Sequence, residues 1–311
     1  MSPDELKLAL GGVVSFPVTP FRPDGALDVG RFKEHIEYQA STIASALFVA
    51  CGTGEGFSLS PDEIRHVIVE ARGSVGAASI PIVVGVGQGF ANASELASDA
   101  KRLGADGVLI MPPYMVTGSQ RGLLEYYAQI ASSTNLGTIV YQRGLRLEPS
   151  TVARLSEIPN VIAFKDGLGD LELMKRLQTT LGSRLRFMNG LPTAELSVQP
   201  YRSAGATSFS SAVLNFLPEI VEAFDTAVET GTQESVDHLL RDFYVPLADL
   251  RDQVPGYPVS LIKAAVSLRL GSVGHPRPPL TPPTSEHLER LSQLIDVGLS
   301  YSRTVIQAPD R

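Results

Sequence analysis

The sequence has one cysteine, no tryptophan and five histidines in 311 residues. A lone cysteine, Cys51, cannot form a disulfide within the chain, so a disulfide-stapled fold is excluded. The five histidines lie far apart in the sequence, and none forms a metal-ligand pair at the usual close spacings. The sequence therefore predicts a protein that binds no metal.

Long hydrophobic runs and a basic charge excess are also missing. No uninterrupted run of roughly 18 apolar residues occurs, and the first residues do not form a signal peptide. We therefore expect no membrane span and a cytoplasmic location. With 26 Lys and Arg against 33 Asp and Glu, the net charge is −7. This balance argues against a nucleic-acid partner but allows a small anionic substrate, which one or two local cations could hold.

Short β-branched runs alternate with helical patterns along most of the chain. Their nearly continuous apolar character is typical of parallel strands buried on both faces. Eight such units favour an α/β fold, a (β/α)8 TIM barrel over residues 1–225, with an open doubly wound sheet as the alternative. The predicted strands are residues 12–18, 46–50, 81–86, 107–111, 138–141, 161–165, 185–188 and 206–209.

Several helices between these strands carry start signals. Ser60 and Glu63 form a capping box, and Asn92 with Glu95 suggests a second one. Further helices are expected at residues 29–39, 122–132, 150–157, 171–180 and 193–201. After residue 216 the pattern is helical, apart from a connection at residues 271–283 that contains five prolines. We expect residues 226–311 to form additional C-terminal helices packed on the barrel.

In a barrel of this kind the active site lies at the carboxyl ends of the strands. Lys165 ends a buried apolar run, so its amine would be desolvated and its pKa lowered, which suits a nucleophilic amine. The structural alternatives are a lysine that reaches solvent or one that pairs with Asp166. Tyr141, which ends another strand, could move a proton or could simply fill the barrel top.

Other strand ends supply groups that could bind a substrate. The backbone N–H groups of the Gly52-Thr53-Gly54 turn could hold a carboxylate, although an ordinary tight turn would have the same sequence pattern. Arg143 is a candidate anion clamp or a solvated loop charge. The candidate substrate-binding residues are Gly52, Thr53, Gly54, Arg143, Asn189, Gly190, Ser208 and Ser210.

Two further patterns have weaker functional interpretations. The glycines of residues 85–89 follow a strand, but their spacing does not match a dinucleotide-binding loop. Cys51 could be a nucleophile, yet no histidine is expected near it to activate the thiol. A buried structural cysteine is the favoured interpretation.

Taken in order, the loop of residues 52–55, the strand end at Tyr141 and the run 161–165 resemble the dihydrodipicolinate synthase and N-acetylneuraminate lyase superfamily over essentially the full chain. The resemblance implies that Lys165 forms a Schiff base with a 2-keto acid and that Tyr141 donates or accepts a proton. It also implies that Gly52, Thr53 and Gly54 bind the keto-acid carboxylate, and that the protein is a homo-oligomer, a dimer or a tetramer.

Within that superfamily, four stretches are similar to the subgroup of 5-dehydro-4-deoxyglucarate dehydratases. They are residues 50–59, 210–216, 256–260 with Lys263, and 277–281. The chain departs from the synthases at Met115, where they have a second relay tyrosine supplied across a subunit contact. Gln142-Arg143-Gly144 also replaces their proline-serine-arginine sequence. Gln142 and Gly144 differ from the pattern of the dehydratase subgroup as well.

The resemblance therefore implies a decarboxylating dehydratase that acts on a 2-keto sugar diacid in glucarate breakdown. It would release 2,5-dioxopentanoate, water and carbon dioxide, and it would need no metal or organic cofactor, because the Schiff base itself is the electron sink. Two alternatives stay open. One is another Schiff-base lyase or aldolase acting on pyruvate or a 2-keto acid, and the other is a non-catalytic sugar-acid binding protein.

Overall fold

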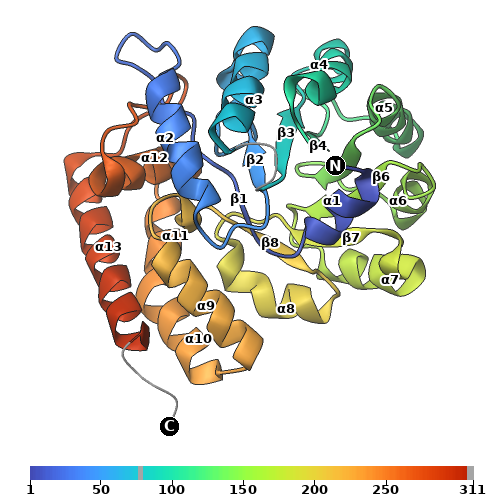
Figure 1. Ribbon diagram of the computed structural model, residues 1–311. Coiled ribbons are helices and arrows are strands. Elements are labelled where there is room, and N and C mark those ends of the chain that lie inside the picture. Colours follow the sequence, from blue (N-terminus) through green and yellow to red (C-terminus); the bar gives the residue numbers. More distant parts are fainter. Residues whose placement is uncertain (76–79, 307–311) are drawn as a thin grey trace.

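The computed structural model describes residues 1–75 and 80–306 of the chain. Within them, eight parallel strands close into a barrel in the order β1 to β8, and helices surround it (Figure 1). Closure is direct, because β8 pairs with β1 from Gly12↔Ser208 to Ser15↔Ser211. The predicted (β/α)8 barrel is confirmed, and the open sheet is excluded.

All eight predicted strands are present, with shifted ends. β1 is shorter than expected because Pro17 follows it closely and has no backbone N–H for the ladder. β8 begins later than expected because Ala206 N still donates to Tyr201 O, which closes the preceding helix. The strands are β1 (Gly12–Ser15), β2 (Leu47–Val49), β3 (Ile82–Val86), β4 (Gly107–Ile110), β5 (Gly137–Gln142), β6 (Val161–Asp166), β7 (Arg186–Asn189) and β8 (Ser208–Ser211).

The capping box at Ser60 is confirmed. Ser60 N donates to Glu63 at 2.9 Å, and Glu63 N donates to Ser60 Oγ at 3.2 Å. The second box is wrong, because α4 starts at Phe90 behind Gly89, whose φ of +116° turns the chain without a side-chain cap. Asn92 thus lies inside the helix. The outer helices are α2 (Val29–Ala40), α3 (Pro61–Val75), α4 (Phe90–Leu103), α5 (Gln120–Ser132), α6 (Pro149–Leu155), α7 (Leu171–Leu181) and α8 (Val198–Ser203).

A short N-terminal helix, α1 (Pro3–Ala9), was not expected from the sequence. It begins with a capping box between Ser2 and Glu5, a signal that the sequence did contain. Its fully buried Leu6 packs at Gly107 and Gly137, the residues that open β4 and β5. The helix therefore covers the amino end of the barrel and leaves the carboxyl end free for a site.

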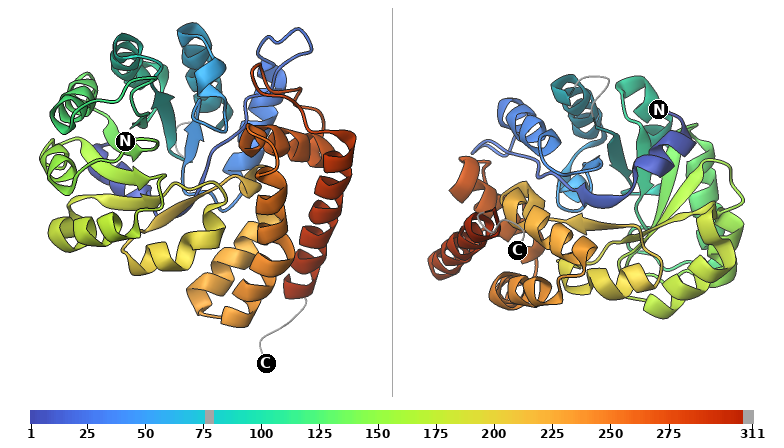
Figure 2. Two further views of the ribbon diagram at one scale, coloured as in Figure 1. Left: turned by 180° about the vertical axis from the view of Figure 1, so that it is seen from behind. Right: turned by 60° about the horizontal axis from the view of Figure 1, so that its bottom comes forward.

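The eighth outer helix, α9 (Pro218–Thr230), includes residue 225, the expected end of the barrel domain. Beyond it lie α10 (Gln233–Leu239), α11 (Val245–Arg251), α12 (Tyr257–Leu270) and α13 (Ser285–Ile306). Their apolar side chains share a core cluster with α9 and β8, and Figures 1 and 2 show them gathered on one side of the barrel beside α2. Residues 307–311 lie outside the described part of the chain.

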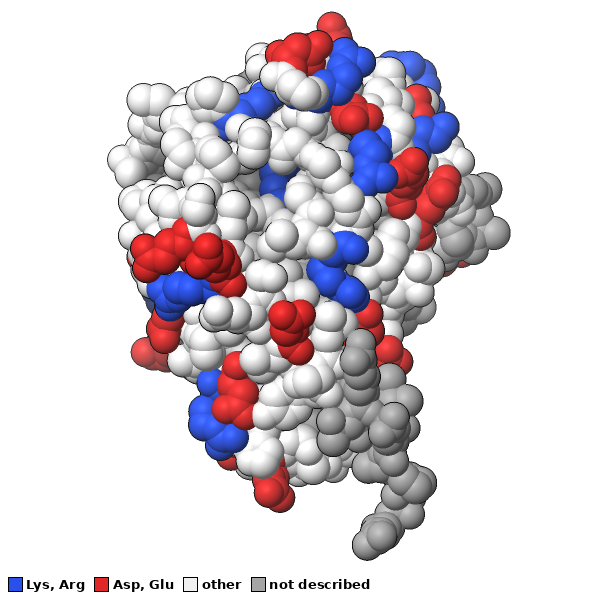
Figure 3. All heavy atoms as spheres, turned by 90° about the vertical axis from the view of Figure 1, so that its left-hand side faces the viewer, with Lys and Arg blue, Asp and Glu red and all other residues white. Residues whose placement is uncertain are grey.

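Acidic and basic side chains are interspersed on the face that carries these C-terminal helices (Figure 3). The described residues of that face form no broad basic surface, as nucleic-acid binding requires. None of the helices in the described ranges is long and apolar enough to cross a membrane.

Candidate active site

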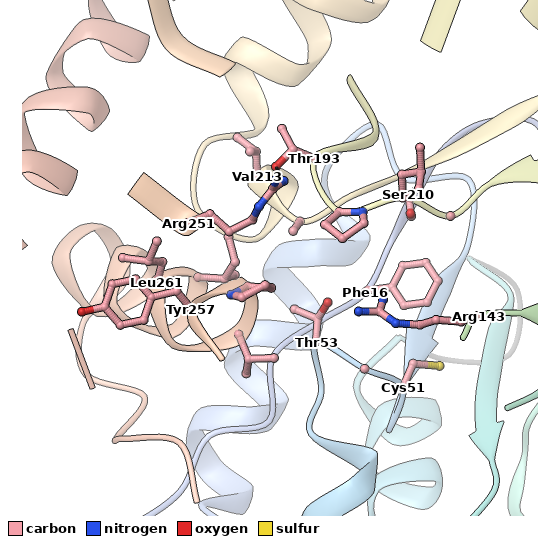
Figure 4. A pocket seen from close by; sticks show the side chains of 18 of the residues that line it. Phe16, Cys51, Thr53, Arg143, Thr193, Ser210, Val213, Arg251, Tyr257 and Leu261 are labelled. Carbon is pink, nitrogen blue, oxygen red and sulfur yellow. Dashed lines mark hydrogen bonds between the residues drawn. The ribbon is translucent and has the colours of Figure 1, made fainter. Parts of the chain in front are cut away.

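A cavity of about 290 Å³ lies at the carboxyl ends of the strands, the position expected for a barrel enzyme. It is close to the lower end of the size range of small-molecule sites, roughly 300–1,000 Å³. Figure 4 shows Arg143 beside Phe16, and Arg251 beside Thr193, with Thr53 between the two arginines. The predicted site residues that line the cavity are Gly52, Thr53, Tyr141, Arg143, Lys165, Gly190 and Ser210.

Lys165 extends from β6 into the interior of the barrel mouth and is only 3% exposed. Its Nζ lies 4.2 Å from the centre of the Tyr141 ring, 4.9 Å from that of Phe16 and 3.4 Å from the carbonyl oxygen of Gly190. Burial lowers the pKa of the amine, against the opposing effect of the nearby Tyr141. The structure thus provides a desolvated amine whose neutral, nucleophilic form is favoured.

Neither structural alternative for Lys165 applies. The side chain does not reach solvent, and Asp166 faces the other side of the strand, as the alternation of side chains requires. There the fully buried Asp166 carboxylate accepts hydrogen bonds from Gln142 Nε2 and from the backbone N–H groups of Leu168 and Asp170, each at 2.9 Å. Gln142 thus fixes β5 to β6 and does not line the cavity.

Tyr141 on β5 is held beside the amine. Its hydroxyl donates to Gly190 O at 3.3 Å, and Arg143 Nη1 donates to the same hydroxyl at 3.4 Å. Burial alone would raise the pKa of this phenol, but the positive charges of Lys165 and Arg143 outweigh burial and lower it. The pair can therefore exchange a proton between an amine and a phenol inside one cavity.

Gly190 has to be glycine for this geometry. A Cβ at position 190 would lie 2.5 Å from Lys165 Nζ and 2.8 Å from Asp166 O. The backbone of residue 190 can approach the amine closely because it carries no side chain.

The loop after β2 brings Gly52 and Thr53 to the cavity, but Gly54 does not line it. Gly54 packs behind the turn, where a Cβ would lie 2.9 Å from Pro17 O, and its carbonyl accepts a hydrogen bond from Thr19 Oγ1 at 2.6 Å. Glu55, the next residue, adopts a left-handed conformation with φ of 54°.

Asn189 and Ser208 also lie outside the cavity lining. Asn189 shares the outward-facing position of its strand partner Asp166, and its side-chain amide donates to Ala194 O and Ser197 Oγ. Ser208 lies two residues deeper in β8 than Ser210, and its buried hydroxyl has no hydrogen-bond partner among the described residues. Ser210 does line the cavity and donates to Asn189 O at 3.3 Å.

Some cavity residues had not been singled out from the sequence. Phe16 follows β1, while Thr193 and Glu195 follow β7, and Arg251 ends α11. Arg251 Nη1 donates to Thr193 Oγ1 at 2.6 Å. No local pattern marks these residues, because the elements that carry them meet only in the folded barrel. Tyr257 also lines the cavity, and it did belong to one of the subgroup-like stretches.

Glu195 is a further buried titratable group of the cavity, with 1% exposure. Its Oε1 accepts a hydrogen bond from Ser211 Oγ at 2.5 Å, and its Oε2 has no partner within the described ranges. Burial raises the pKa of this carboxyl to about 7. An acid that can hold its proton near neutral pH therefore borders the cavity.

Cys51 lines the cavity but is 1% exposed, and burial raises its pKa to about 12, so the thiolate is strongly disfavoured. Gly85 and Gly87 serve packing, since a Cβ at Gly85 would lie 2.6 Å from Ala50 O and one at Gly87 would lie 2.9 Å from Met111 Cβ. Tyr114 and Met115 are 68% and 85% exposed and do not line the cavity.

Across residues 1–75 and 80–306, no cluster of three or more His, Cys, Asp or Glu side chains could hold a metal ion.

Comparison with known proteins identifies the chain's relatives. The model of the dihydrodipicolinate synthetase family matches residues 9–297. The chain belongs to this family. It is 46% identical over 292 residues to a probable 5-dehydro-4-deoxyglucarate dehydratase of Streptomyces avermitilis, covering 92% of this chain and 93% of the relative. It is 42% identical to a protein of that name from Rhizobium meliloti over 301 residues, 96% and 99% of the two chains.

Among solved structures, the crystal structure of dihydrodipicolinate synthase from Bacillus clausii superposes with a TM-score of 0.87 at 25% identity. The match covers 94% of this chain and 99% of that chain. The resemblance that the sequence motifs indicated is thereby confirmed, both for the superfamily and for the subgroup that the relatives represent. The family is one of lyase-type enzymes, and the closed barrel with a buried lysine fits that chemistry.

Proposed function

We propose that the protein is a 5-dehydro-4-deoxyglucarate dehydratase that works through a Schiff base on Lys165. The observation that carries the proposal is the buried Lys165 amine, which faces Tyr141 in the cavity at the carboxyl ends of the strands. The names of relatives that are 41–46% identical over more than nine-tenths of the chain supply the substrate class.

The reaction begins when the neutral Lys165 amine attacks the substrate ketone and water leaves to form an iminium. This cation draws electrons from the adjacent methylene, so a base can remove a proton there while the hydroxyl on the next carbon leaves as water. Tyr141, with its lowered pKa, is positioned to carry that proton.

The product of this step is a conjugated iminium, and it accepts a second electron pair. The bond to the far carboxylate breaks, carbon dioxide leaves, and its bonding electrons pass into the conjugated system. Protonation and hydrolysis then release 2,5-dioxopentanoate and regenerate the amine. One electron sink serves both bond cleavages, and we assign no metal or organic cofactor to the site.

We assign the keto-acid carboxylate to the turn of Gly52 and Thr53, with Gly54 supporting that turn from behind. Arg143 is our candidate for the far carboxylate, and Ser210 for the hydroxyl groups between the two ends. Asn189 and Ser208 would act indirectly, through the positions of Gly190 and Ser210.

We further propose a cytoplasmic homo-oligomer, a dimer or tetramer, in which residues 1–225 form the barrel and residues 226–311 the C-terminal extension. Tyr114, Met115 and Val116 support association, because the three neighbouring side chains are 64–85% exposed on one loop. Light scattering on the purified chain measures the oligomeric state.

A substrate panel tests the proposed reaction. The purified protein is incubated with 2-keto sugar diacids and 2-keto monoacids, and both carbon dioxide and pyruvate are measured. Carbon dioxide release from the diacid, without pyruvate, supports the dehydratase. Pyruvate release would instead indicate an aldolase on the same Schiff base. A protein that binds the diacid without turnover would be a binding protein.

A further inference from the structure

A buried ion pair lies directly behind the turn that borders the cavity. Lys263 Nζ and Glu55 Oε1 are 2.8 Å apart, and the two side chains are 1% and 0% exposed. Glu55 follows Gly52, Thr53 and Gly54 in the chain, whereas Lys263 comes from the middle of α12 in the C-terminal extension. The pair thus connects the extension to the cavity.

The charged groups of the pair are fully engaged. Lys263 Nζ also donates to Thr19 O at 2.9 Å and to His275 O at 3.2 Å, so each of its three N–H bonds has an acceptor. Glu55 Oε2 accepts from the backbone N–H of Arg277 at 2.9 Å. The centre of the Phe21 ring lies 4.0 Å from Lys263 Nζ. Because these hydrogen bonds engage both charged groups, they fix the two side chains in one arrangement.

The backbone conformation of Glu55 connects the ion pair to the turn that borders the cavity. Glu55 has φ 54° and ψ 33°, a left-handed conformation that costs energy for a residue other than glycine. Glu55 N donates to Gly52 O at 3.1 Å and Gly56 N to Cys51 O at 2.8 Å, which closes the turn. The side-chain anchor therefore holds the strained residue on which the orientation of Gly52 and Thr53 depends.

Stability alone does not explain the pair. Desolvation of two buried charges offsets most of their attraction, and apolar or neutral replacements are often as stable. Nevertheless, Lys263 and Arg277, one from each of two stretches similar to the dehydratase subgroup, both donate hydrogen bonds to Glu55. A role of Glu55 and Lys263 in positioning the turn explains why two charges are buried where the stability of the core does not require them.

We propose that the Glu55–Lys263 pair is a positioning device that orients the Gly52–Thr53 turn, and so lets the site select carbonyl compounds with an adjacent carboxylate. The inference rests on the proposed function in one respect, namely that this turn binds the keto-acid carboxylate. Lys263 and Glu55 do not touch the reacting atoms.

The test compares two carbonyl compounds that differ in the carboxylate. Schiff-base formation on Lys165 is measured by borohydride trapping with pyruvate and with acetone, at concentrations below saturation. The variant E55Q/K263M removes both charges together, so neither partner is left buried and unpaired. We expect its trapping rate with pyruvate to fall roughly 10–100-fold, the usual effect of slightly misplaced binding groups, while acetone changes less than about twofold.

The matched control is E219Q/R269M. Glu219 and Arg269 also form an ion pair that ties α12 to a neighbouring helix, at 2.9 Å, but this pair is partly exposed and does not contact the turn. The control should keep the wild-type ratio of pyruvate to acetone. If E55Q/K263M does not fold, E55Q alone keeps the shape of the side chain and should lower the same ratio several-fold.

The outcomes separate the two proposals. An unchanged ratio in the variants, or equal losses with both compounds, would overturn the positioning role while leaving the Schiff-base chemistry intact. A wild-type protein that traps acetone as readily as pyruvate would refute carboxylate binding by the turn, and the positioning proposal with it.

Discussion

Lys165 Nζ lies 4.2 Å from the centre of the Tyr141 ring, and both groups approach the carbonyl oxygen of Gly190, at 3.4 Å and 3.3 Å. The amine and the phenol are therefore held by a common backbone acceptor at the residue that follows β7. Because they share this anchor, substitutions of the two residues should separate covalent chemistry from proton transfer.

Lys165 should be the residue that is trapped when borohydride is added with a 2-keto acid, because burial keeps its amine available as the neutral nucleophile. Peptide mapping by mass spectrometry locates the adduct. K165A should form no adduct and show no turnover while keeping the fold, and K175A, at an exposed helix position, should behave like the wild type. An adduct on Lys263 would refute the assignment.

Y141F should still form the Schiff base but should turn over roughly 10²–10⁴-fold more slowly, the usual contribution of a positioned acid–base group. The substitution removes the hydroxyl and keeps the ring that packs against the amine. Single-turnover trapping and steady-state rates measure the two effects separately. Y38F, on α2, is the control for loss of a tyrosine hydroxyl. A steady-state rate equal to that of the wild type would make Tyr141 structural.

The sequence predicts the residues whose role follows from strand position. Lys165 and Tyr141 end apolar runs, so a parallel barrel necessarily brings them to its mouth. Asn189 also ends a strand, but side chains alternate along β7 and its amide faces away from the cavity. A shift of one residue along the strand decides whether a side chain faces the cavity or the opposite side. Apolar runs do not predict the ends of strands to within one residue.

Residues supplied by distant elements could not be predicted. Glu195 follows β7 and Arg251 ends a helix of the extension, and they border one cavity because of packing between the extension and the barrel. Similarly, Lys263 is separated from Glu55 by 208 positions. Its role becomes visible when α12 packs behind the loop.

G190A should displace the Lys165 amine, because the added methyl group would lie 2.5 Å from Nζ. We expect turnover to fall roughly 100-fold or more, the effect of a misplacement of about 1 Å. G73A is the matched control, since a Cβ at this helical position meets nothing within 4 Å. It should keep full activity and stabilise the fold by about 0.5–1 kcal/mol. Full activity of G190A would show that a displaced Lys165 amine still supports turnover at the wild-type rate.

E195Q should change the pH dependence of stability. Burial raises the pKa of Glu195 from 4.5 to about 7, so between these pH values the folded protein holds a proton that the unfolded chain has released. The free energy of unfolding of the wild type should therefore fall as the pH rises through this interval, by at most about 3 kcal/mol, and stay level above it.

The neutral glutamine removes that dependence. Thermal unfolding should show E195Q more stable than the wild type at pH 8 and similar to it below pH 5. E234Q, at an exposed position of α10, controls for the loss of a carboxylate in general. Parallel pH profiles for E195Q and the wild type would mean that Glu195 is charged in the folded protein throughout this range.

Arg143 is the cavity cation best suited to the far carboxylate of a diacid. No acidic side chain pairs with it among the described residues, and its guanidinium donates a hydrogen bond to the Tyr141 hydroxyl. Arg251, the other arginine of the cavity, already binds Asp252 through Nε at 2.7 Å and Nη2 at 2.8 Å. An unpaired guanidinium can grip a carboxylate in bidentate fashion, whereas a paired one would first have to release its partner.

R143A should therefore weaken binding of the diacid by about 1.5–3 kcal/mol, the contribution of a hydrogen bond to a charged group. This corresponds to a rise in KM of roughly 10- to 150-fold. Pyruvate, which lacks the second carboxylate, should still be trapped on Lys165 at nearly the wild-type rate. R121A, at an exposed position of α5, controls for the loss of a positive charge. Equal losses for diacid and pyruvate would show that Arg143 acts on Tyr141 and the amine, and a KM that rises in R251A but not in R143A would place the far carboxylate at the opposite side of the cavity.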